Sequence, residues 1–133
     1  MSTGPYAALS ADFELLQGTQ RQIMAATSRR EEGWRWAVVQ HRRTLATQLA
    51  ALSEKIRALP EPGAGDTLHK AARDSVSKLR AALAEHQARW PAVAIDPDAE
   101  GYRSSVDGVR TSYRAVEAAL TALRAAISNG ERT

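Results

Sequence analysis

Large apolar side chains recur at alternating intervals of four and three residues along the last third of the chain. This seven-residue period places them on one narrow stripe of an α-helix, the pattern of helices that pack lengthwise against near-parallel partners. We expect this helix over residues 97–129, with Asp96 as its N-cap, Pro97 at its first position and Gly130 as its stop. The stripe consists of Tyr102, Val106, Val109, Tyr113, Val116, Leu120, Leu123 and Ile127.

Two further helices are expected before it, over residues 33–59 and 67–90. Residues 60–65 separate them and form the strongest helix-breaking segment of the chain, with two prolines and two glycines. Asp66 caps the later helix, and the short link over residues 91–96 makes that helix an antiparallel neighbour of the last one. The two stripes are Trp34, Val38, Leu45, Leu49, Leu52, Ile56 and Leu59, and then Leu68, Ala72, Val76, Leu79, Leu83, His86 and Trp90.

The first helix, expected over residues 10–29 with Ser10 as its cap, carries a weaker stripe. Gln20 and Thr27 occupy positions where the period calls for an apolar side chain. The apolar residues of this helix are Phe13, Leu16, Ile23 and Met24.

The segment between the first two helices is compatible with two shapes. A break is favoured because Ser28 and Glu31 match a capping box and Gly33 is a poor residue for a helix interior. One continuous helix is favoured by the phase of the apolar stripes. Extending the stripe of the second helix backwards keeps the apolar residues of the first helix on the same face. A continuous helix over residues 10–59 would be about 75 Å long and would need a second chain to cover it, giving a homodimer. We expect the break.

The chain of 133 residues fits a single domain, residues 1–133. Its expected fold is all-α, an antiparallel bundle of three or four helices with coiled-coil-like heptad packing. Cysteine is absent, which excludes disulfides and thiolate zinc sites. No apolar run approaches the roughly 20 residues that span a bilayer, so we expect no membrane partner. The first residues lack the order of an export signal, and Ser2 replaces the glycine needed for N-myristoylation, so the cytoplasm is the expected compartment.

The two neighbouring tryptophans have different expected roles. Trp34 lies on the apolar stripe of its helix and should belong to the core. Trp36 points to the opposite side, which it shares with Val39 and Arg43. Because Trp and Arg are over-represented at interface hot spots, these three residues form the expected partner-binding surface for another protein.

A nucleic-acid partner is the weaker alternative. The formal net charge is only +3, and most basic residues are interrupted by acidic ones, as on an ordinary solvated helix surface. The densest basic group is diluted by Glu31 and Glu32, although Trp36 could stack on a base. That group consists of Arg29, Arg30, Arg35, Arg42 and Arg43.

No motif for catalysis, cofactor binding or metal binding stands out, so we expect a protein that is not an enzyme and holds no cofactor. His41 and His86 fall on apolar stripes and are interpreted as interior side chains. His69 stands beside its stripe near the start of a helix, close to Lys70 and Arg73. A half-exposed His among cations resembles the histidine phosphotransfer domains, and this resemblance implies His69 as an alternative phosphoacceptor.

Residues 6–59 resemble the flagellar export chaperones of bacteria. The resemblance rests on a leading amphipathic helix, an acidic turn that closes on Trp34, and a second helix with paired arginines and spaced leucines. It implies a small cytoplasmic helical bundle that holds unassembled flagellar subunits. Combined with the Trp36 surface, it predicts a non-catalytic interaction protein, a chaperone or adaptor for export.

Overall fold

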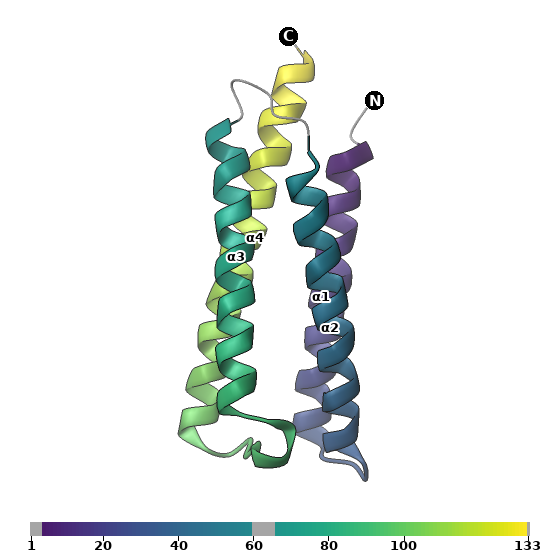
Figure 1. Cartoon of the computed structure of the whole chain (residues 1–133), viewed down its shortest axis with the longest axis vertical. Helices are drawn as coiled ribbons and strands as arrows, with labels where there is room; N and C mark the ends of the chain where they lie inside the picture. Colours follow the sequence, from purple (N-terminus) through teal and green to yellow (C-terminus); the bar gives the residue numbers. More distant parts are fainter. Residues whose placement is uncertain (1–3, 60–65, 133) are drawn as a thin grey trace.

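The computed structural model describes residues 4–59 and 66–132, and the described chain is all-α, without strands. Four helices run antiparallel in chain order along one long axis, as Figure 1 shows. The expected antiparallel bundle is therefore confirmed, with four helices. They are α1 (Gly4–Arg29), α2 (Trp34–Arg57), α3 (Asp66–Arg89) and α4 (Glu100–Arg132), with a short 3-10 turn, η2 (Ala92–Ala94), between the last two.

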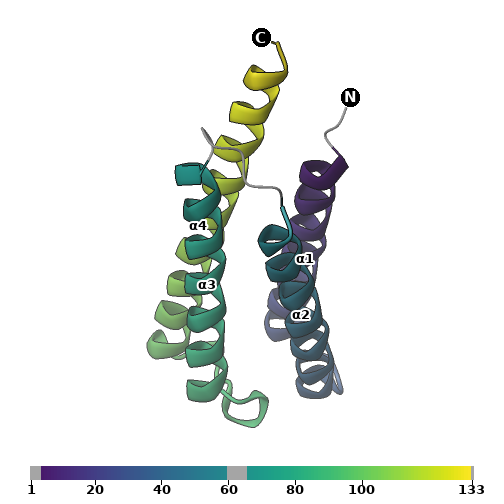
Figure 2. The same ribbon diagram turned by 45° about the horizontal axis from the view of Figure 1, so that its top comes forward.

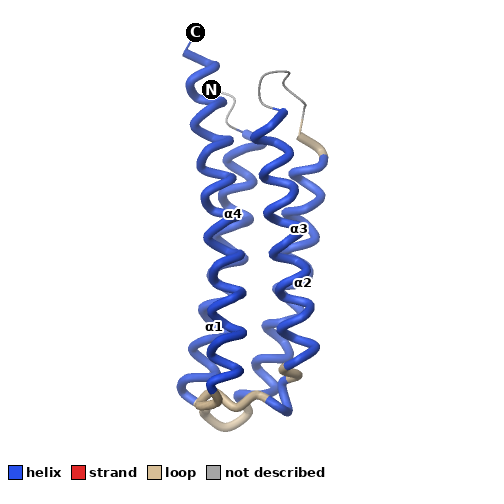
Figure 3. Tube along the Cα trace, turned by 90° about the vertical axis from the view of Figure 1, so that its left-hand side faces the viewer, coloured by secondary structure: helices blue, strands red, loops and turns tan. Residues whose placement is uncertain are grey.

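The bundle is built from two helical hairpins, α1–α2 and α3–α4, that lie against each other (Figure 2). The α1–α2 and α3–α4 connections lie at one end of the bundle, whereas the start of α1 and the end of α4 lie at the other (Figure 1). Seen from the side, α1 and α4 flank one edge of the bundle and α2 and α3 the other (Figure 3). The last turns of α4 extend past the ends of the other helices.

The predicted stripes form the core. On α4 every predicted stripe residue from Tyr102 to Leu123 is buried except Val106, which is partly buried, and Ile127 lies beyond the side chains that the structure describes. Val116 and Leu123 are almost completely hidden from solvent, because the seven-residue period keeps them facing the other helices along the whole bundle. The core residues contributed by the first two helices are Leu9, Phe13, Leu16, Ile23, Val38, Leu45, Leu49, Leu52 and Ile56.

Three of the expected N-caps are wrong. Asp66, expected to precede its helix, is the first residue of α3. The first helix begins at Gly4 rather than at Ser10, so Ser10 is an interior helical residue. The last helix begins at Glu100, three residues later than expected, because the Asp96 carboxylate accepts a hydrogen bond from the Asp98 backbone N–H at 3.0 Å. Asp96 thus stabilises a turn before the helix and does not cap the helix itself.

The expected helix ends differ by small amounts. The α4 helix continues to Arg132, so Gly130 does not stop it. The α2 and α3 helices end at Arg57 and Arg89, two residues and one residue earlier than expected. The predicted breaker over residues 60–65 lies outside the described residues.

The expected break between α1 and α2 is confirmed, but the capping box is not its cause. Ser28 remains inside α1, and the chain turns at Arg30 and Gly33, whose φ angles are +51° and +79°. These left-handed conformations end one helix and allow the next to start at Trp34, whose N–H donates to the Glu31 carbonyl at 3.0 Å. Glycine adopts this conformation without the Cβ penalty, which explains why it stands at position 33.

Polar contacts tie the two hairpin turns together at this end of the bundle. The Arg30 guanidinium donates to the Asp98 carboxylate at 2.9 Å, between exposed side chains. The Arg35 guanidinium donates to the Ala92 carbonyl at 2.5 Å and lies 4.2 Å from the ring centroid of Trp34. These contacts link the α1–α2 turn to the α3–α4 connection.

Two glycine substitutions should change stability in opposite directions. Gly33→Ala should lower the free energy of unfolding by about 1 kcal/mol, because a Cβ strains the left-handed backbone. Gly108→Ala should raise it by about 0.5–1 kcal/mol, because this glycine lies inside α4 and its added Cβ would meet nothing within 4 Å. Urea unfolding monitored by circular dichroism measures both changes. A stabilising Gly33→Ala would contradict the turn, since alanine favours a continuous helix.

Candidate partner-binding site

The residues predicted to bind a partner lie on one outward side of α2, at spacings of three and four residues. Trp36 is 65% exposed, an unusual position for an indole, and Arg43 is also exposed. Val39 is partly buried and packs against the core, so it forms the base of this surface. Together these three residues constitute the Trp36 face. A tryptophan that projects from a rigid helix can insert into a partner's pocket at little entropic cost.

Trp34 differs from Trp36 as predicted. It is partly buried and packs against the core, and the Arg35 guanidinium covers its ring. This cation–π contact and the Arg35 hydrogen bond to the carbonyl of Ala92 fix the first turn of α2. The Trp36 face therefore projects from a part of α2 that is joined to the α3–α4 connection.

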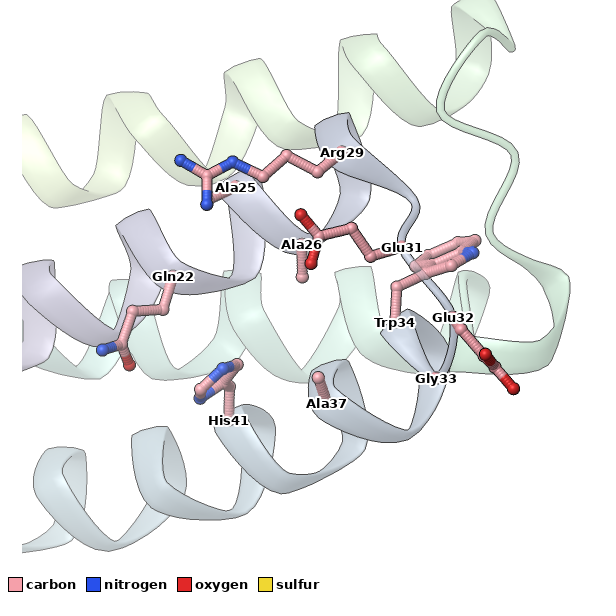
Figure 4. Close-up of a pocket in the computed structure, with 10 residues that line it drawn as sticks. All are labelled: Gln22, Ala25, Ala26, Arg29, Glu31, Glu32, Gly33, Trp34, Ala37 and His41. Carbon is pink, nitrogen blue, oxygen red and sulfur yellow. The ribbon is translucent and has the colours of Figure 1, made fainter.

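A pocket of about 300 Å³ lies between α1 and α2 beside their turn (Figure 4). At one end Gln22 from α1 and His41 from α2 project toward each other, and at the other end the ring of Trp34 lies beside the turn. Arg29 and Glu31 supply a cation and a carboxylate to the same pocket. This set can form hydrogen bonds with a polar ligand or a peptide backbone.

His69 is not the half-exposed side chain that a phosphoacceptor requires. It is 1% exposed, and neither ring nitrogen has a hydrogen-bond partner within the described chain. The period of α3 explains the error: counting back by four and three from Val76 through Ala72 reaches His69, not Leu68. His69 is therefore a stripe residue, and Leu68 is the partly buried one.

His86 lies inside the bundle, as predicted, and is 8% exposed. Its Nδ1 is 2.6 Å from the hydroxyl oxygen of Ser105 on α4, and its ring centroid is 5.6 Å from that of Tyr102. Burial, with a smaller contribution from the positive charge of Arg42, lowers the pKa of His86 from 6.5 to about 4. The imidazole is therefore neutral in the folded protein near pH 7.

The cations and hydroxyls around His86 link the four helices. Burial lowers the pKa of Arg42 on α2, and its Nη2 atom is buried with no hydrogen-bond partner among the described residues. Burial raises the pKa of Tyr102, whereas the hydroxyl of Thr27 on α1 lowers it by hydrogen bonding. Trp90 completes the group with an edge-on contact to Tyr102, their ring centroids 5.5 Å apart. These contacts join α3 to α4 near the hairpin turns.

The five arginines that suggested nucleic-acid binding do not form one surface. Arg42 is directed into the bundle, Arg35 binds the α3–α4 connection, and Arg30 is paired with Asp98. Across the described ranges, no three His, Asp or Glu side chains gather in a way that could hold a metal ion. No helix within those ranges is both long and apolar enough to cross a membrane.

Comparisons with protein-family models, with curated proteins and with solved structures found no match for this chain.

A His69→Leu substitution should raise the free energy of unfolding by about 1 kcal/mol. Leucine has a similar size and removes a buried imidazole whose nitrogens have no partner in the described chain. His69→Ala, which leaves a cavity instead, should lower stability by about 2 kcal/mol. Both changes can be measured by urea unfolding. A destabilising His69→Leu would show that the imidazole has a partner, such as a buried water.

Acidification should destabilise the protein through His86. Its pKa is depressed on folding, so its contribution is intact above pH 6.5 and is lost as the pH falls from 6.5 toward about 4, where the unfolded chain binds the proton more readily. Unfolding free energies of the wild type and of His86→Gln, measured across this range, isolate the contribution of His86. The wild type should lose more stability than the variant, and parallel curves would contradict the depressed pKa.

Proposed function

We propose that this protein is a non-catalytic binding module for another protein and that the Trp36 face contacts the partner. The proposal rests on one observation above all, the 65% exposure of Trp36 on the first turns of α2. Transferring an indole from water to a protein interface is favourable in proportion to its large apolar area, and a Trp beside an Arg is typical of interface centres. Arg43 would supply a hydrogen-bonding cation at the edge of the contact.

The more specific form of the proposal is a cytoplasmic chaperone or adaptor for bacterial flagellar export. Its support is the resemblance of residues 6–59 to flagellar export chaperones, and an all-α bundle agrees with the fold that this resemblance implies. In this role the protein would hold an unassembled subunit and keep its apolar surface away from other chains. The Trp36 face lies within the segment that carries the resemblance.

Trp36→Ala should weaken partner binding without affecting the fold. Removal of a central interface tryptophan costs about 2 kcal/mol or more of binding, which is over tenfold in affinity. The matched control is Leu15→Ala, because Leu15 is also a large exposed apolar residue, 60% exposed, but lies on α1. Each immobilised protein is used to capture partners from a lysate of its host cells, and the captured proteins are quantified by mass spectrometry.

The expected result is a captured protein that the Leu15→Ala variant retains and the Trp36→Ala variant loses. Equal recovery by both variants would contradict the Trp36 face. The chaperone role has a separate test, co-elution of the purified wild type with monomeric flagellar subunits of the same host in size-exclusion chromatography. Failure to co-elute with any of these subunits would contradict the export role and leave the general binding function intact.

A further inference from the structure

A groove runs between α1 and α4, along the edge of the bundle where Figure 3 shows these two helices together. It contains three hollows of about 230, 140 and 340 Å³, each lined by residues of both helices. Along α4 the lining extends from Tyr102 to Arg124, about 33 Å at 1.5 Å per residue. We call this the α1–α4 groove. Its apolar lining is formed by Phe13, Met24, Val106, Val109, Tyr113 and Leu120.

The groove exists because α1 presents polar side chains where α4 presents apolar ones. Gln17 and Gln20 line the groove opposite the valines and tyrosine of the α4 stripe. The hydroxyl of Tyr113 donates to the Gln20 side-chain oxygen at 3.3 Å, which is a long hydrogen bond. Met24 and Val106 stay partly exposed as a result. Val109, Tyr113 and Leu120 form the buried floor of the groove, and the unbranched Gln and Met side chains of α1 can rotate aside to uncover them for a ligand.

The charges along the groove differ between its two ends. Near the hairpin turns the cations are Arg21 from α1 with Arg103 and Arg110 from α4. Asp107 is the one carboxylate among the residues that line these two hollows, and it lies 3.5 Å from Arg110. The third hollow, toward the chain ends, is lined instead by Glu14, Glu117 and Arg124. One half of the groove is therefore basic and the other is more acidic.

We propose that the α1–α4 groove binds an amphipathic helix of a partner protein, with acidic residues facing Arg21, Arg103 and Arg110. The groove is straight, has the length of about six helical turns and offers apolar hollows along one line, which fits side chains spaced by three and four residues. The basic half selects an acidic ligand. A second copy of this chain, the alternative occupant, would be recognised by self-association of the wild type.

This site is separate from the surface assigned to the proposed function. The Trp36 face belongs to α2, whereas the groove is lined by α1, α4 and the Pro97 turn. A partner could contact both, with the tryptophan and the groove acting as two independent points of attachment. Because the Trp36 face and the α1–α4 groove share no residue, an experiment can contradict one proposal and leave the other intact.

A synthetic peptide of about 22 residues tests the groove, with leucine at alternating spacings of three and four and glutamate flanking the leucines of its N-terminal half. Binding of the labelled peptide to the full chain is measured by fluorescence anisotropy at low salt. The paired variant Arg21→Glu/Arg110→Glu should weaken binding of the peptide by about tenfold or more. Both substituted cations lie in the basic half of the groove, where they would face the glutamates of the peptide. The matched control is Lys78→Glu/Arg80→Glu, the same charge change on exposed residues of α3.

A charge-swapped peptide with lysine in place of glutamate supplies the reciprocal test. It should bind the Arg21→Glu/Arg110→Glu variant more tightly than the wild type, which a general loss of folding could not produce. Circular dichroism verifies that each variant remains helical. A Trp36→Ala chain should bind the acidic peptide as the wild type does.

Three results would overturn the groove as a helix site. These are no binding of the acidic peptide to the wild type, equal weakening by the α3 control, and loss of binding on Trp36→Ala alone. The last result would transfer the helix contact to the Trp36 face, so the proposed function would survive and the groove would not. Self-association of the wild type that blocks the peptide would identify a second copy as the occupant and would also contradict the proposal.

Discussion

The left-handed backbone at Arg30 and Gly33 is the constraint on which the rest of the structure depends. Without it, residues 4–57 would continue as one helix of about 80 Å, far longer than α3 could cover. The two positive φ angles instead fold α1 back along α2, so that one chain covers its own apolar stripe. Arg30 adds a second function, because its guanidinium reaches Asp98 and links this turn to the α3–α4 connection.

The bundle combines an apolar core with several polar side chains in its interior, and the two parts have different consequences. Apolar residues at the seven-residue period give the four helices their common axis. The polar residues of α1 interrupt this packing on the side of α4, which leaves the α1–α4 groove. His86, Arg42 and Tyr102 interrupt it again near the hairpin turns, where hydrogen bonds and ring contacts partly replace apolar contacts. We therefore propose partner binding at two places. One is the α1–α4 groove, where the packing of the core is least complete, and the other is Trp36, which projects from α2.

Much of the fold could be predicted from the sequence because a helix and its buried face are set by local spacing. The α4 stripe was predicted almost residue by residue, and so was the difference between Trp34 and Trp36. Helix ends were less predictable, because a good capping residue such as Asp96 can stabilise a turn before the helix instead. The expected α3 stripe contains Leu68 in place of His69, because leucine is the more apolar of these two neighbours. The alternation of four and three residues nevertheless indicates His69 as the buried one.

The groove could not be predicted from spacing, since the stripes do not specify which two helices lie side by side at its edge. The weak stripe of α1 was a usable signal that packing there would be incomplete. The partial burial of Val39 also needed the structure, because a residue on the outward side of a helix can still contact a neighbouring element. Tertiary packing determines whether a side chain at the boundary between the buried and the exposed face of a helix is buried.

The central claim, that the chain folds back on itself at residues 30–33, is tested most directly by a distance across α1 and α2. The absence of cysteine allows spin labels at Ala11→Cys and Glu54→Cys, exposed neighbours of Asp12 and Lys55, whose side chains form an ion pair at 2.7 Å. Double electron–electron resonance on labelled protein diluted with unlabelled protein should give a distance within about 25 Å, two helix diameters. A distance of about 65 Å, the length of 43 helical steps, would show one continuous helix and contradict the account.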